Sequence, residues 1–190
     1  MLDLHVIHAI GNALTKYRSE GLSSLFAELS PDYRTKLEGY LAKEVTLDSA
    51  FQNKEGGLPI IVVQQSDSLF DDKVLANQSP SSDTHARKHI MTNKTVVIAM
   101  MAAEMDTVRL LHRICQAALI HYGSSFLNVG YQNLLYRGSQ PLTLDDDVTT
   151  TGLATFGRML KWSAVHILEI DDKPLQNLPV EIQPFGDGNG

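Results

Sequence analysis

The first third of the chain shows apolar positions at helical spacing. Residues 4–17 place apolar side chains three and four positions apart, which predicts an amphipathic helix. Residues 22–29 and 31–41 continue this spacing, so two further helices are expected there. Ser30 followed by Pro31 is typical of a helix start, because serine caps free N–H groups and proline suits the first helical position.

Beyond residue 57 the spacing becomes that of strands, with one long helix between them. β-branched runs or alternation predict four strands, at 58–65, 89–101, 129–137 and 158–170. The helix is predicted over 104–122. Its apolar face carries Leu111, Cys115 and Leu119, and Gly123 is a suitable stop.

The order of these elements predicts an α+β fold with a mostly antiparallel sheet and helices packed on one face. Residues 1–170 are expected to form one domain with a helical insertion at 21–52. The polar segment 66–83 reads as a long loop or flap. The proline-rich residues 171–190 read as an extended tail.

Composition narrows the function classes. A length of 190 residues suits one domain, and the net charge of −6 argues against a generic nucleic-acid binder, which needs basic residues. No apolar run is long enough for a membrane span, and the start lacks the basic residues of a secretory signal, so assembly in a cytoplasm is expected. The single cysteine, Cys115, cannot form an internal disulfide and is expected to be buried and inert.

An aspartate triplet, Asp145, Asp146 and Asp147, is the most unusual local feature. Calcium loops place their ligands at alternate positions around a turn glycine, whereas three consecutive aspartates point in different directions. No nucleophile with a partnered base lies nearby in the sequence. The triplet is therefore interpreted as a solvated loop or as an acidic surface at an interface or channel, without a metal.

The histidines offer no specific catalytic or metal motif. His85 and His89 are four positions apart, which would suit a metal on a helix, but their segment is predicted to run from loop into strand. His112 and His121 are nine apart on the predicted long helix and cannot share one ligand. No cofactor and no catalysis are expected.

The order of elements resembles the tail terminator proteins of long-tailed bacteriophages, both lambda-type and contractile-tail relatives. The matching features are the amphipathic helix 4–17, the strand at Leu58-Pro-Ile-Ile-Val-Val and the strand 94–100 that feeds the long helix. A last strand at 158–170, preceded by an Asp-rich loop, completes the likeness. The insertion 21–52 and the tail after residue 171 depart from the family's pattern.

The resemblance implies a structural protein of the virion, located at the tail neck and assembled in the host cytoplasm. Its subunits would form a ring, expected to be a hexamer, that caps the tail tube, ends tube polymerisation and joins the tail to the head-side connector. In contractile tails the ring would also hold the sheath, and DNA would pass through its channel without specific binding. The aspartate triplet would face this channel or a neighbouring ring.

Two alternatives stay open from the sequence. The chain could be another neck or head–tail connector protein, which would share the virion location. A metal-dependent hydrolase that uses the aspartate triplet with a histidine is the enzyme alternative, and it lacks a recognisable nucleophile, base or metal signature.

Overall fold

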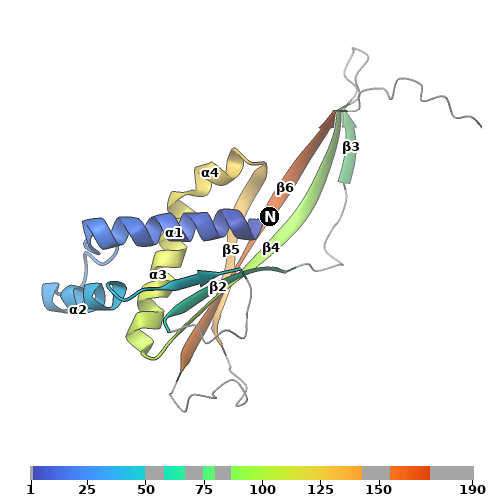
Figure 1. The fold of residues 1–190 in the computed structure, drawn as a ribbon. Helices are drawn as coiled ribbons and strands as arrows, with labels where there is room; N and C mark the ends of the chain where they lie inside the picture. Colours follow the sequence, from blue (N-terminus) through green and yellow to red (C-terminus); the bar gives the residue numbers. More distant parts are fainter. Residues whose placement is uncertain (1, 50–57, 67–74, 80–86, 143–154, 172–190) are drawn as a thin grey trace, which may run out of the picture.

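The computed structural model describes residues 2–49, 58–66, 75–79, 87–142 and 155–171, with the backbone alone described at 66, 75–79, 87–91 and 168–171. Helices and strands alternate irregularly along the chain (Figure 1). The elements are α1 (Leu2–Glu20), α2 (Pro31–Leu41), β1 (Thr46–Asp48), β2 (Ile60–Ser66), β3 (Leu75–Ser79), β4 (Arg87–Ala102), α3 (Met105–His121), α4 (Gly123–Leu127), β5 (Tyr131–Pro141) and β6 (Phe156–Asp171).

The main sheet has the strand order β1-β2-β4-β6-β5, and β3 pairs with β4 outside this path. β1 runs parallel to β2, whereas every other pairing is antiparallel. β4 and β6 form the long centre of the sheet, paired in one register from Arg87–Asp171 to Ala102–Phe156. The predicted α+β class with a mostly antiparallel sheet is confirmed.

The core lies between the helices and one face of the sheet, which we call the helix-covered face (Figure 1). Alternate residues of each strand point to the same face of a sheet, so every second position is buried here. α3 lies over β4 and β6 and α1 lies nearer β2. From the strands, the core takes Ile61, Val63, Val96, Ile98, Met100, Ala102, Tyr131, Leu160, Trp162 and Ala164.

A glycine ends α1 and a serine cap begins α2, whereas Gly123, predicted as the stop of the long helix, is the first residue of α4. Gly21 adopts a positive φ of 79° and donates its N–H to the carbonyl of Tyr17 at 3.0 Å, which closes α1. The Ser30 hydroxyl accepts the N–H of Tyr33 at 3.4 Å, so Ser30 caps α2 as expected. α3 buries Leu111, Cys115 and Leu119 as predicted.

Several sequence predictions need correction. Residues 22–29 form two successive turns rather than a helix, because the N–H groups of Leu25 and Phe26 both bond to Leu22 and the bonding does not continue as a helix. The short elements β1 and α4 were not predicted. β3 falls inside the predicted loop 66–83, and β5 continues past Gly138 to Pro141.

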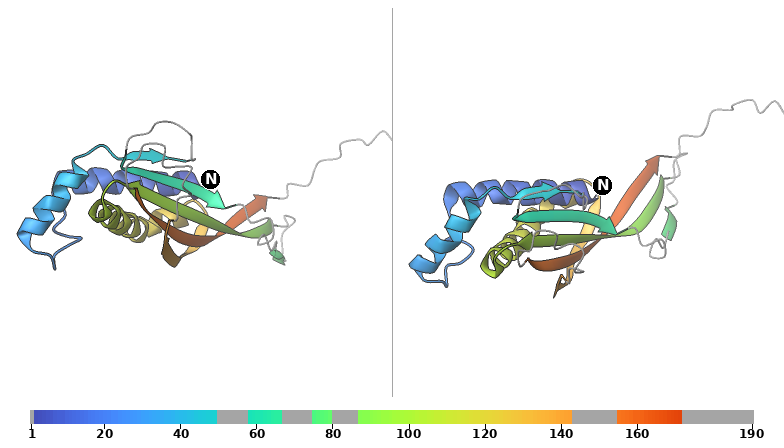
Figure 2. Two further views of the ribbon diagram at one scale, coloured as in Figure 1. Left: turned by 90° about the horizontal axis from the view of Figure 1, so that it is seen from below. Right: turned by 60° about the horizontal axis from the view of Figure 1, so that its bottom comes forward.

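The two central strands extend beyond the helices, as both views in Figure 2 show. We call this extension the arm; it comprises β3, residues 87–91 of β4 and residues 167–171 of β6. β2 pairs with β4 only as far as Thr95, and β5 pairs with β6 only as far as His166. The arm is therefore a three-stranded ribbon that projects from the body.

Candidate interaction surface

The aspartate triplet lies outside the described residues, so its role stays a prediction. The described chain stops at Leu142 and resumes at Thr155, next to the start of β6. The Leu142 N–H donates to the carbonyl of Gly157 at 3.1 Å. A Cβ added at Gly157 would lie 2.8 Å from the Leu142 Cβ, so a glycine is needed for this close approach.

The face of the sheet opposite the described helices carries apolar residues at the end away from the arm. Val62 of β2 pairs with Ala99 of β4, and both are buried, although neither belongs to the core between helices and sheet. Around them lie the partly exposed side chains of Ile60, Val97, Met101 and Met159. We call these six residues the apolar sheet face.

Toward the arm the same face carries both polar and apolar side chains, among them partly exposed Val165. Thr95 pairs with Ser163, and the Arg137 side chain donates to the Ser163 hydroxyl at 2.6 Å. The sequence predicted partly apolar character on both faces of the strands 89–101 and 158–170. For the described side chains of this face, this holds both away from the arm, at Met159, and toward it, at Val165 and Ile167.

The two edges of the main sheet differ in how they could meet another chain. β1 has only three residues. β5 is longer, but its register with β6 shifts twice, with Asn133 and Gly138 at positive φ values of 52° and 138°. Such bulges interrupt the regular row of donors and acceptors that a new strand needs. In the part of the chain that the structure describes, neither edge of the main sheet therefore presents a long regular template.

The arm has apolar residues at adjacent rungs of its strand pairing. Adjacent rungs belong to opposite faces of a sheet, so apolar positions occur on both faces of the ribbon. Figure 2 shows no described helix against the arm. One rung consists of Leu75, Met91 and Ile167. The next rung consists of Ala76, Ile90 and Leu168.

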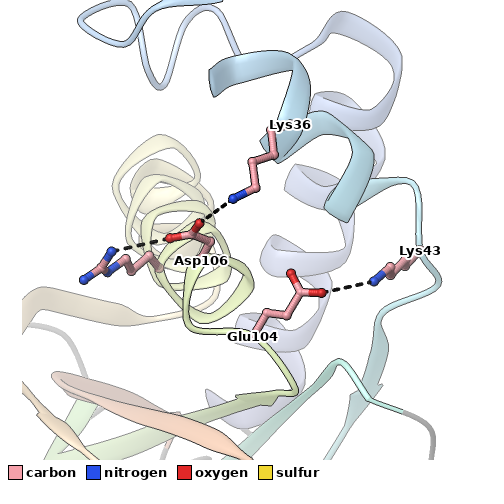
Figure 3. Close-up of polar contacts among 5 residues, drawn as sticks. Lys36, Lys43, Glu104 and Asp106 are labelled. Carbon is pink, nitrogen blue, oxygen red and sulfur yellow. Dashed lines mark hydrogen bonds and ion pairs between the residues drawn. The ribbon is translucent and has the colours of Figure 1, made fainter. Parts of the chain in front are cut away.

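A polar network joins the region predicted as an insertion to the start of α3 (Figure 3). Lys36 of α2 contacts the Asp106 carboxylate at 3.1 Å, and Arg109 contacts its other oxygen at 3.4 Å. Lys43 pairs with Glu104 at 3.9 Å. The hydrogen bond from Lys36 is the main cause that lowers the pKa of Asp106.

This network is exposed, so it orients α2 more than it stabilises the fold. Burial of Leu37 and Leu41, together with hydrogen bonds from Arg18 to the carbonyls of Leu41 and Lys43, also fixes α2 to the body. Leu37 and Leu41 belong to the same core cluster as α1 and α3. Within residues 21–49, α2 is thus packed into the domain.

Among the described residues, no group of three or more histidine, cysteine, aspartate or glutamate side chains is placed to hold a metal ion. His85 and the side chain of His89 lie outside the described part. His112 is half-buried, and burial, followed by the charges of Arg158 and Arg113, lowers its pKa. Burial raises the pKa of the Cys115 thiol to about 12, which makes it a poor nucleophile at neutral pH.

The fold brings together His5, Tyr131 and His166. This cluster was not predicted from the sequence. The Tyr131 ring stacks on His166 at 4.4 Å and meets the edge of His5 at 5.9 Å. These residues come from α1, β5 and β6, and their contact depends on strand pairing between Tyr131 and His166. No local sequence pattern signals such a contact.

The chain has no match among models of known protein families, and no curated protein matches its sequence. In the part of the chain that the structure describes, no helix is both long and apolar enough to cross a membrane.

Proposed function

We propose that this chain is a tail terminator subunit of a long-tailed bacteriophage. Its copies form a ring that caps the tail tube, ends tube polymerisation and joins the tail to the head-side connector. The observation that carries the proposal is the apolar sheet face, because a ring requires contacts between different surfaces of neighbouring copies. Partly exposed Val97, Met101 and Met159 offer such a contact without using a sheet edge.

The arm and the charge of the chain support the same proposal. A three-stranded ribbon that projects from the body gains stability when another chain covers it. The net charge of −6 suits a channel through which DNA passes, because rows of basic residues would bind the phosphates. An aspartate triplet facing this channel or a neighbouring ring adds to the repulsion.

Tail assembly in vitro tests the proposal. Purified tail tube protein is allowed to polymerise with and without this chain, and tube length and end structure are followed by electron microscopy. We expect shorter, capped tubes with a closed ring, most simply of six copies, at one end. Unchanged tube length, or one or two copies at the end, would contradict a terminator ring. Binding only to the head side would favour the alternative of a connector protein.

A pair of variants tests the apolar sheet face. Val97→Asp places a charge on this face, whereas Ile120→Asp makes the same kind of change on α3, where Ile120 is 73% exposed. We expect Val97→Asp to abolish ring formation, measured by native mass spectrometry with tube protein present, and Ile120→Asp to keep it. Thermal unfolding of both variants shows whether they are folded. Equal ring formation by two folded variants would exclude this face as the contact.

A further inference from the structure

The helix-covered face of the sheet changes from apolar to polar beneath the first turn of α1. Beyond Val96 and Trp162 the positions on this face are Lys94 opposite the buried Ala164, then Thr92 opposite His166, and Tyr131 pairs with His166. Leu2 is nevertheless fully buried, and its N–H donates to the side chain of Gln65 at 3.2 Å. The first turn of α1 is therefore attached to the sheet at the edge of the core.

His166 lies against the Tyr131 ring and close to the backbone of Gly130. Its ring stacks on Tyr131 with an interplanar angle of 26°, and Tyr131 is only 5% exposed. Gly130, at a φ of 83°, brings its backbone close enough that an added Cβ would lie 3.5 Å from the His166 Cδ2. The other ring contact of Tyr131 is His5 of α1, so the first turn of α1 rests on the ring that His166 supports.

The groups around His166 disfavour a positive charge there. Burial is the main cause that lowers its pKa, followed by Lys94 of β4, the amino group that begins the chain and His5 of α1. Asp3 of α1 acts on Tyr131, whose pKa is raised chiefly by burial and then by the charge of Asp3. A cation stacked on a tyrosine ring is attractive, but at an accessible site this is worth only about 0.5–1 kcal/mol.

We propose that the contact of His166, Tyr131 and His5 is a pH-sensitive attachment of the first turn of α1, which loosens when His166 is protonated. A charged imidazole needs water and is repelled by Lys94, so it moves away from the Tyr131 ring. His5 then loses its support, and the turn that carries Leu2 opens more often. The rest of α1 stays on the sheet, because Ile10, Ala13 and Leu14 are buried elsewhere in the core. This inference does not depend on the ring.

Amide hydrogen exchange at Leu2, whose N–H bonds to Gln65, and at Val6, the fifth residue of α1, tests the proposal, as protection factors at pH 7.5 and pH 5.5 corrected for intrinsic exchange. We expect a severalfold loss of protection at pH 5.5 in the unaltered chain. His166→Phe keeps an aromatic ring without a titrating proton, so protection should be equal at both pH values. His121→Phe is the matched control, because exposed His121 also contacts a tyrosine ring, that of Tyr122 at 4.9 Å, and the loss should persist.

A titration of the unaltered chain covers the case in which His166→Phe fails to fold. Imidazole resonances of His166 and amide resonances of residues 2–6 are followed by NMR between pH 8 and pH 5. A common midpoint for both supports the proposal. Amides that titrate with a different midpoint, or protection that is the same at both pH values, would overturn it.

Discussion

Truncation of Leu111 tests whether α3 forms the centre of the core. Leu111 is 1% exposed and belongs to the cluster between the helices and the sheet. Leu111→Ala removes about three methylene-sized groups at about 0.8 kcal/mol each, or about 2.4 kcal/mol of transfer free energy. The space left behind raises the cost, so we expect the free energy of unfolding to fall by about 3–4 kcal/mol.

Urea unfolding measures this loss with two probes, circular dichroism and the fluorescence of Trp162. Trp162 is the single tryptophan of the chain and is 5% exposed, so its emission reports on the core. Ile120→Ala on the same helix is the control, because Ile120 is 73% exposed and its truncation should cost no more than about 0.5 kcal/mol. A loss below about 0.5 kcal/mol for Leu111→Ala, or equal losses for both, would refute the assigned face of α3.

Three further predictions follow from single features of the fold. Gly157→Ala should lower the melting temperature, because its Cβ would lie 2.8 Å from the Leu142 Cβ. Gly39→Ala, in α2 with no atom within 4 Å, should instead stabilise the chain by about 0.4–1 kcal/mol. Because the pKa of His112 is lowered in the folded chain, the unfolded state binds more protons below its ordinary pKa of 6.5. The stability that neutral His112 contributes is therefore complete above pH 6.5 and declines as the pH falls, and His112→Gln should flatten this part of the melting-temperature profile. Replacement of the whole aspartate triplet by asparagine should leave the melting temperature nearly unchanged and impair tail joining; tight binding of calcium by the unaltered chain, lost in this variant, would contradict the interpretation.

The sequence predicted the elements whose pattern is long and regular. α1 and α3 run for 19 and 17 residues, and their buried positions repeat at helical spacing. The cap at Ser30 was predictable because it depends on neighbouring residues only. The helix predicted at 22–29 was wrong, because the apolar residues of this segment have helical spacing but contact the core through two turns.

Features that depend on partners far along the chain could not be predicted. β1 has three residues and exists through its pairing with β2, while β3 is a polar segment held by pairing with β4. The candidate interaction surface was likewise predictable only where it depends on local pattern. The apolar character of strand faces was visible as alternation, whereas the stack of Tyr131 on His166 arises from the register between β5 and β6.

The bulges of β5 affect whether free copies of the chain can stack edge to edge. A long regular edge would let each copy recruit the next as soon as it is synthesised, and the chains would stack without limit. Asn133 and Gly138 break that edge, and the opposite edge at β1 is too short to replace it. Within the described residues, neither edge of the main sheet therefore favours the stacking of free copies. For the proposed ring, we expect the timing of assembly to be set by a surface that captures the copies, rather than by their own concentration.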